Sequence, residues 1–371
     1  MTIAGLDWVV HRQPVKDAGW ALITGRVAAV DCVIVTLTTT DGTVGRGVIS
    51  SLPPFDPPLA AIEAVLRAFV PLVVGRAAGE IGPVVDALDR RQHGFSSVKA
   101  GIEIALTELA ARRRGCSIAA MLGGVAVPRL PVLRIVPLLA PEAMADFAGG
   151  LAGRGYRTLK VKLGGDEAID LRRVAAVRTR VGDAVALTVD ANGSYDAKGA
   201  LRLASGLAEL GVVLFEQPVA AADREGLALV TRSTTMIVEA DESAASLSDI
   251  AALLRDRAVD SINLRIADLG GIRPVLRAIA MCEAAGIGWR FGACFLPSQH
   301  QAVTAHVAAA FVRPRGVAHE LAEHELFDGD PFGPLPVENG EIVLPGGAGS
   351  GIDLEGASPP AACRPPIARS S

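Results

Sequence analysis

The feature that most constrains this fold is a regular alternation of short apolar runs and helical patterns after about residue 130. Eight runs can form buried strands, at residues 132–139, 158–164, 185–192, 212–218, 236–242, 261–268, 288–295 and 316–322. Helical patterns separate them, for example at residues 168–180, 197–210, 247–255, 273–285 and 299–311. Eight strands and seven helices at a step near 25 residues predict a parallel (β/α) barrel. A doubly wound sheet fits this pattern less well.

The N-terminal part has a different, α+β texture. Strands expected at residues 30–38 and 43–50 are joined by the turn Thr40-Asp41-Gly42 and predict a hairpin. Helices are expected at residues 58–68, 84–89 and 96–113, the last of them capped by Ser96 or Ser97. Its apolar stripe is formed by Ile102, Ala105, Leu106 and Leu109.

The chain is therefore expected to divide into an α+β domain (residues 1–127), a barrel (128–325) and a Gly/Pro-rich C-terminal segment (326–356). One short strand is expected in this segment, at residues 342–344. The tail at residues 357–371, with Pro359-Pro360 and Pro365-Pro366, is expected to be disordered or loosely attached.

Composition excludes several classes of protein. The 371 residues include 36 Lys and Arg against 40 Asp and Glu, and this net charge of −4 argues against an electrostatic nucleic-acid binder. The five cysteines are scattered and never form a C-x-x-C pair, so neither a disulfide framework nor a zinc ribbon is expected. We find no signal-peptide pattern and no uncharged apolar stretch of 18 residues. We therefore expect a cytoplasmic protein with no membrane partner.

Charged residues occur late in five successive strands, although barrel strands are buried on both faces. Period-2 alternation turns them toward the barrel interior, while Glu242 has the opposite parity. These inward residues are Lys160 and Lys162, Asp190 with Thr188 and Asn192, Glu216, Asp241 and Arg265. The steps from Lys162 to Asp190, Glu216, Asp241 and Arg265 are 28, 26, 25 and 24 residues, about one βα unit each. The charges therefore meet at the C-terminal mouth, where such barrels build active sites.

Three carboxylates at one mouth repel one another unless a cation neutralises them. The oxygen ligands Asp190, Glu216 and Asp241 favour Mg²⁺ first and Mn²⁺ second. Taken alone, any of these acids is as readily a helix N-cap, and either lysine more commonly extends toward solvent. Five charges in register are not explained in that way.

The chemistry that this set predicts is removal of the proton beside a carboxylate, whose enolate the cation stabilises. Lys162 lies nearer the mouth and is the predicted base. Lys160, two residues away on the same face, is the charge that tunes its basicity.

With these residues in place, the sequence resembles the enolase superfamily, in particular the muconate lactonizing enzyme-like subgroup of its mandelate racemase/muconate lactonizing enzyme branch. The motifs that carry the resemblance are Leu159-Lys160-Val161-Lys162, Val189-Asp190-Ala191-Asn192, Phe215-Glu216-Gln217-Pro218, Ala240-Asp241-Glu242-Ser243 and Gly270-Gly271. Further matches are helix 98–111 with Leu122-Gly123-Gly124, and Ile342-Val343-Leu344-Pro345 with Gly346-Gly347. Together they cover about residues 1–355.

The resemblance implies a modified TIM barrel, (β/α)7β, with an N-terminal α+β capping domain that the C-terminal segment completes. A cap loop near residues 17–26 would close over a small carboxylic acid, which Lys160 would contact. Mg²⁺ would be held by Asp190, Glu216 and Asp241, with Asn192 and Glu242 beside these ligands. A homo-oligomer is also implied.

Two departures from the family pattern bear on the reaction. Racemases and epimerases of this branch carry a second lysine on strand six, where this chain has Arg265, a poor base that could hold a carboxylate or steady the enolate. One-base dehydration or cycloisomerisation is therefore favoured over the alternative of an amino-acid or dipeptide racemase or epimerase. A metal-binding relative without turnover is a further alternative. Residues 292–298 lack the acid that relatives often carry after strand seven, so the substrate contacts of those relatives do not carry over to this segment. Its candidate substrate contacts are Cys294 and Phe295.

The segment His319-Glu320-Leu321-Ala322-Glu323-His324 superficially resembles a zinc-protease helix. Its histidines are five residues apart, whereas that motif needs four. We expect His319 to face inward at the end of strand eight as a further candidate substrate contact, and His324 to lie in solvent.

Overall fold

The computed structural model describes residues 1–17, 20–22, 25–53, 55–312 and 317–354. Its N-terminal part is built on an antiparallel sheet of β1 (Ile3–Pro14), β4 (Ala29–Thr39) and β5 (Val44–Ser51), in the order β1-β4-β5. The predicted hairpin is confirmed as β4 and β5, and the Gly42 N–H donates to the Thr39 carbonyl in its turn. Strand β1 was not predicted, because its half-exposed sequence carries several polar residues. The short strands β2 (Ala21–Leu22) and β3 (Gly25–Arg26) pair with each other.

Helices α1 (Leu59–Val73), α2 (Ile81–Arg91) and α3 (Ser96–Arg114) confirm the three expected helices, and α4 (Ile118–Met121) follows them. Helix α3 packs on the sheet through one face and on barrel helices through another, so residues 97–111 are all buried. The predicted serine cap is wrong. The N-cap position is Phe95, in the left-handed region with φ 53°, and no side chain caps the helix.

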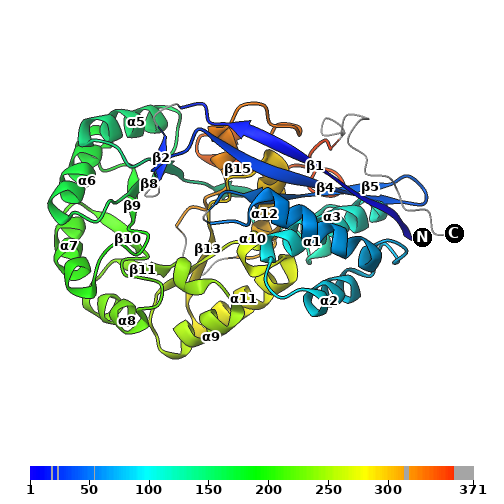
Figure 1. Cartoon of the computed structure of the whole chain (residues 1–371). Helices are drawn as coiled ribbons and strands as arrows, with labels where there is room; N and C mark the ends of the chain where they lie inside the picture. The colour runs from blue at the N-terminus through cyan, green and yellow to red at the C-terminus, as the bar shows by residue number, and fades with distance from the viewer. Residues whose placement is uncertain (18–19, 23–24, 54, 313–316, 355–371) are drawn as a thin grey trace.

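A parallel sheet of seven strands curls into the barrel in sequential order. The strands are β7 (Arg134–Val136), β8 (Thr158–Lys162), β9 (Ala186–Asp190), β10 (Val212–Glu216), β11 (Ile237–Ala240), β12 (Ser261–Leu264) and β13 (Gly288–Phe291). The helices are α5 (Pro141–Gly153), α6 (Glu167–Val181), α7 (Ala197–Glu209), α8 (Arg224–Ser233), α9 (Leu247–Arg255), α10 (Ile266–Leu269), α11 (Ile272–Ala285) and α12 (Ser298–Ala309). Helices α5 to α9 and α11 form an arc outside the strands (Figure 1). The modified barrel with its α+β cap is thereby confirmed.

A strand was predicted over residues 316–322 at the eighth barrel position. The structure has there an extended segment that forms one isolated β-bridge. Gly316 lies outside the described residues, and from residue 317 the segment forms only one parallel bridge, between Val132 and His319. On one side the Leu133 N–H donates to the His319 carbonyl, and on the other the Glu320 N–H donates to the Phe291 carbonyl. The segment thus joins β7 to β13 and closes the barrel.

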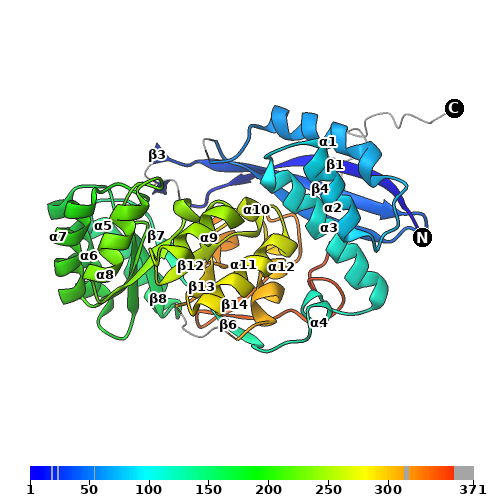
Figure 2. The same cartoon turned by 90° about the horizontal axis from the view of Figure 1, so that it is seen from below.

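The C-terminal segment returns toward the N-terminal part. Strands β14 (Val337–Glu338) and β15 (Glu341–Val343) pair with β6 (Arg129–Pro131) in the order β14-β15-β6. Beyond them Gly349 bridges Ser117 and accepts from the Ile118 N–H at the start of α4. Figure 2 shows α4 below α3, beside the barrel. The tail expected at residues 357–371 lies outside the described residues.

Two large apolar cores fill the molecule. One lies between the sheet β1-β4-β5 and helices α1 to α3. The other fills the space between the barrel strands and their helices, and it extends to Ile34 and Val48 of the cap sheet. Among the residues described, we find no helix with both the length and the apolar character needed to cross a membrane.

Candidate active site

The predicted charges converge at the C-terminal ends of the barrel strands. Lys162 is in register with Asp190, and Asp190 is in register with Glu216. Asp241 follows β11 directly and Arg265 follows β12. The side chains of the two lysines and three acids are all buried, and that of Arg265 is 23% exposed. The six charges therefore lie at one end of the barrel interior (the lumen), on the faces that the alternation of side chains predicted.

The two lysines hold two of the three acids. The Lys162 ammonium is 2.6 Å from Asp190 Oδ2 and 2.9 Å from Asn192 Oδ1. The Lys160 ammonium is 3.1 Å from both oxygens of Glu216, 3.3 Å from Asp190 and 2.8 Å from Glu320. Burial alone would lower the pKa of Lys160, but these three carboxylates raise it well above its ordinary value. Lys160 is therefore a fixed positive charge.

Arg265 forms ion pairs with Asp241 and, at 3.2 Å, with Asp268. Burial alone would lower the pKa of this guanidinium, but the two carboxylates raise it well above its usual range. Burial also raises the pKa of Asp241 to about 7, although Arg265 opposes that effect. The guanidinium of Arg265 therefore stays protonated and cannot accept a proton from substrate.

The charge balance of the lumen favours an additional cation. Five buried carboxylates (Asp190, Glu216, Glu239, Asp241 and Glu320) face four cations (Lys160, Lys162, Arg265 and Arg290). Burial and the charge of Asp190 raise the pKa of Glu216 well above its usual value. In the described part of the chain, no three His, Cys, Asp or Glu side chains converge to hold a metal, because lysines and arginines hold the acids. By donor chemistry and strand-end placement, Asp190, Glu216 and Asp241 fit a hard divalent cation.

Two residues with unusual backbone angles support the acids. Asn192 has φ 44°, and its N–H donates to Asp190 Oδ1 while its amide donates to Glu242 at 2.9 Å. Gln217 has φ 38°, and its side-chain oxygen accepts from the N–H groups of Asp241 and Ser243. Positive φ at a residue other than glycine is uncommon and is often found at functional sites. We did not identify Gln217 from the sequence, although it directly follows Glu216 in a quoted motif.

The lumen below the site contains charges that the sequence analysis also missed. Arg290 lies 2.5 Å from Glu216 and 2.6 Å from Glu239, and it also contacts Glu320. Asn263 donates to Glu216 at 3.0 Å. Strand parity could have indicated Glu239, which lies two residues before Asp241. Neither Arg290 nor Glu320 lies two residues from a charge that the sequence had placed inside the barrel.

The three candidate substrate contacts, Cys294, Phe295 and His319, have different surroundings in the structure. Cys294 is half-buried, and burial together with the charge of Asp268 raises the pKa of its thiol, so the thiolate is disfavoured. Phe295 packs edge-on against Trp20, with ring centroids 5.2 Å apart, and against Phe327 at 6.4 Å. It therefore joins the barrel to the cap loop.

The predictions for the two histidines are wrong. The His319 ring lies outside the lumen against Trp289 and Phe291, and its Nδ1 accepts from the Phe291 N–H. Glu320 is the inward residue instead. His324 is buried and contacts the Leu335 carbonyl at 2.8 Å. Parity could not assign these faces, because the segment forms a bridge in place of a ladder.

The cap contributes described residues near the mouth. In the predicted loop at residues 17–26, positions 18, 19, 23 and 24 lie outside the described residues. Trp20 is buried against Phe295, and the Leu138 N–H donates to the Ala21 carbonyl near the end of β7. Asp56 accepts from Ser50 at 2.5 Å, and burial together with the charge of Asp268 raises its pKa.

Residues 7–123 match the family model of the mandelate racemase / muconate lactonizing enzyme N-terminal domain, and residues 143–358 match the enolase C-terminal domain-like model. Chloromuconate cycloisomerase CbnB of Cupriavidus necator is 33% identical over 289 residues, which are 77% of this chain and 78% of the relative. The L-Ala-D/L-Glu epimerase of Bacillus subtilis is 31% identical over 340 residues, 88% of this chain and 90% of the relative.

Solved structures of these kinds of enzyme also match this chain over nearly its whole length. A substrate-liganded complex of the Bacillus subtilis epimerase superposes with a TM-score of 0.90 at 29% identity, covering 95% of this chain and 99% of that one. The muconate lactonizing enzyme of Pseudomonas fluorescens, complexed with muconolactone, also has a TM-score of 0.90, at 26% identity over 95% and 97% of the two chains.

Proposed function

Because the chain belongs to the mandelate racemase/muconate lactonizing enzyme branch of the enolase superfamily, we propose that it removes the proton α to the carboxylate of a small organic acid, with Mg²⁺ bound, and completes a one-base dehydration or cycloisomerisation. The chain is an enzyme of this isomerase type. Mn²⁺ is the second choice of metal. A cytoplasmic homo-oligomer is part of the same proposal.

The one-base reaction is supported by the ion pairs of Arg265. Its guanidinium is paired with Asp241 and Asp268, which keep it protonated on strand six. Lys162 is then the one candidate base among the six converging charges, since Lys160 is also held in its charged form. Deprotonation from the Lys162 face, with return of a proton or loss of a leaving group on the same face, follows from this asymmetry.

Each residue has a defined part in this reaction. Lys162 takes the α proton, and Asp190 and Asn192 hold its ammonium at 2.6 and 2.9 Å. Lys160 faces the substrate carboxylate and Arg265 steadies the negative charge from the other side. When bound by Asp190, Glu216 and Asp241, Mg²⁺ would supply Lewis-acid stabilisation of the charge that develops on that carboxylate.

A second candidate function is racemisation or epimerisation of an amino acid or dipeptide. It is supported by the Bacillus subtilis epimerase, which matches this chain over 88% of its length. In that reaction a group other than Arg265 would deliver the proton to the opposite face.

Isotope exchange distinguishes these reactions. The enzyme with Mg²⁺ is incubated in D₂O with amino acids, dipeptides, sugar acids, hydroxyprolines and muconates, and α-deuterium and configuration are followed by NMR and chiral chromatography. Exchange with retained configuration, or conversion of the acid to an elimination or lactone product, is expected. Inversion would contradict one-base chemistry and favour the epimerase. No exchange or conversion with any acid would favour a metal-binding relative without turnover.

Lys162→Ala is predicted to lower the exchange rate by about 10²–10⁴-fold, the usual contribution of a general base. The matched control is Lys198→Ala, which removes an exposed lysine at the start of α7 and should exchange at the wild-type rate. Equal exchange in wild type and Lys162→Ala would remove Lys162 from the mechanism.

A further inference from the structure

Beneath the site, four buried side chains form a closed ring of alternating charge. Lys160 contacts Glu216 at 3.1 Å, Glu216 contacts Arg290 at 2.5 Å, Arg290 contacts Glu320, and Glu320 contacts Lys160 at 2.8 Å. None of the four is more than 1% exposed. The ring connects β8, β10, β13 and the bridge segment that closes the barrel.

Arg290 is the member of this ring that connects it to a further buried carboxylate, Glu239. Its Nε lies 2.6 Å from Glu239, in addition to its contacts with Glu216 and Glu320. Without Arg290, Lys160 would be the one cation of the ring against its two buried carboxylates, and Glu239 beside them would lose its guanidinium partner, a costly arrangement at low dielectric. The planar guanidinium suits this position because its fork can hold several acceptors at fixed angles, which a lysine ammonium on its flexible stem cannot do.

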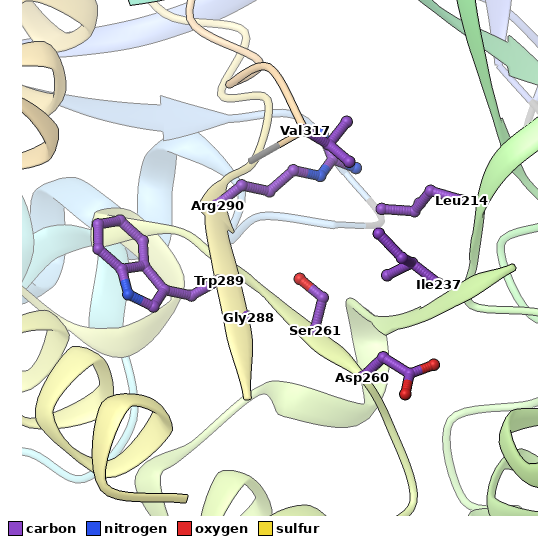
Figure 3. A pocket seen from close by; sticks show the side chains of 8 residues that line it. All are labelled: Leu214, Ile237, Asp260, Ser261, Gly288, Trp289, Arg290 and Val317. Carbon is purple, nitrogen blue, oxygen red and sulfur yellow. The ribbon is translucent and has the colours of Figure 1, made fainter. Parts of the chain in front are cut away.

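Because the four ring members are buried, bulk solvent cannot replace these contacts. Figure 3 shows the Arg290 side chain extending from β13 toward Val317 and Leu214. The cavity that these residues line with Ile237 and Ser261 has a volume of about 20 Å³, enough for about one water molecule. The geometry of the ring therefore depends on its own members and their protein partners.

Glu216 is the predicted metal ligand to which this ring attaches. Arg290 holds its Oε2, Asn263 holds its Oε1 at 3.0 Å, and Lys160 lies 3.1 Å from both oxygens. We propose that Arg290 is a positioning residue, which fixes Glu216 for metal binding and, through Glu320, holds Lys160 in place. This inference rests on the proposed function, in which Glu216 is a ligand of Mg²⁺.

Charge and position make opposite predictions for Arg290. As a positive charge near a cation site, it weakens Mg²⁺ binding, so its removal would tighten binding. As a partner that orients a ligand, it strengthens binding, and loss of such partners typically weakens metal affinity by roughly 10–100-fold. Arg290→Lys keeps the charge and loses the fork, and therefore tests position alone.

The experiment is calorimetric titration of Mg²⁺ into the wild-type chain, Arg290→Lys and Arg134→Lys, with thermal unfolding measured in parallel. Arg134 is a matched control, because it is buried in β7 and paired with Glu323 and Glu325 without contacting a predicted ligand. We expect the Kd of Arg290→Lys to rise about 10–100-fold and that of Arg134→Lys to change less than about threefold. If Arg290→Lys fails to fold, the charge-balanced double variant Arg290→Gln/Glu239→Gln is titrated, with the same weakening expected.

The outcomes separate this inference from the proposed function. Unchanged or tighter binding in the Arg290 variants, with normal binding by wild type, would overturn the positioning role alone. Equal weakening in Arg290→Lys and Arg134→Lys would overturn it as well, because the effect would then be general. No Mg²⁺ binding by the wild-type chain would overturn the proposed function and this inference together.

Discussion

At the scale of single residues, Asp190 is the acid on which the site converges. Lys162 lies 2.6 Å from its Oδ2 and Lys160 lies 3.3 Å from the same atom, while the Asn192 N–H donates to its Oδ1 at 2.9 Å. Burial would raise the pKa of Asp190, but the two lysines lower it well below its ordinary value. Asp190 is therefore ionised across the physiological pH range.

Asp190→Asn is predicted to lose most Mg²⁺ binding, because the amide keeps an oxygen acceptor for Lys162 and removes the anionic ligand. The Kd should rise at least as much as the roughly 10–100-fold expected for loss of an outer partner. Calorimetry measures this change, and Asp183→Asn at an exposed position is the control. Wild-type affinity in Asp190→Asn would take this residue out of the ligand set.

At the scale of elements, the cap depends on an unusually close contact between β5 and α3. Gly45 and Gly47 lie two residues apart on β5 and face α3. A Cβ at Gly45 would overlap the Ala105 carbonyl, and one at Gly47 would overlap the Gly101 carbonyl. Gly101 in turn lies against Ile49. The glycines allow the strand to lie directly on the helix backbone.

Gly47→Ala is predicted to destabilise the fold by about 1–3 kcal/mol, the usual effect of overpacking a close contact. The opposing atoms belong to helix backbone and cannot move aside as a flexible side chain would. Chemical denaturation measures the change in the free energy of unfolding. Gly79→Ala, where an added Cβ meets nothing within 4 Å, is the control and should be neutral. An unchanged free energy in Gly47→Ala would mean that β5 shifts freely on α3.

At the scale of the whole molecule, α3 fastens the cap to the part of the barrel that carries Arg265. Glu103 on α3 is buried, and its Oε1 accepts from the Arg273 N–H at 2.9 Å in the first turn of α11. A Cβ at Gly271 would overlap the Glu103 carboxylate, so the glycine admits the cap side chain. Arg265 lies a few residues before this joint, at the start of α10. Glu103 therefore caps a barrel helix from the other domain.

This joint is predicted to make stability depend on pH. Burial raises the pKa of Glu103 from 4.5 to about 7, although Arg273 and Arg277 oppose this and Asp89 adds to it. The folded state then retains a proton that the unfolded state releases. The Glu103 contribution to stability accordingly falls as pH rises from about 4.5 to 7, by up to about 3 kcal/mol, and stays constant above that range.

Glu103→Gln keeps an oxygen acceptor for the Arg273 N–H and cannot ionise. Its free energy of unfolding relative to wild type should therefore rise between pH 4.5 and pH 8 by about the same 3 kcal/mol. Urea denaturation at several pH values measures the difference. Glu209→Gln, at an exposed position on α7, should follow the wild-type pH dependence. A parallel pH dependence in Glu103→Gln would mean that Glu103 does not titrate in this range.

Periodicity predicted most of the fold. The seven strands β7–β13 and the expected helices were located from runs of apolar residues, because each element imposes its own repeat on neighbouring residues. Strand β1 was missed, because its polar residues obscure the alternation, and the eighth strand is a bridge that pairs with a different strand on each side.

The sequence by itself determined which end of which strand carries Lys160, Lys162, Asp190, Glu216, Asp241 and Arg265. Alternation fixes the face and the length of a βα unit fixes the height, and both are local properties. Only the tertiary structure decided what these charges touch. Arg290 and Glu320 lie 130 and 160 residues beyond Lys160, and they meet its ring because the last segment closes the barrel against β7. Contacts across a closed lumen depend on that closure, which no local pattern records.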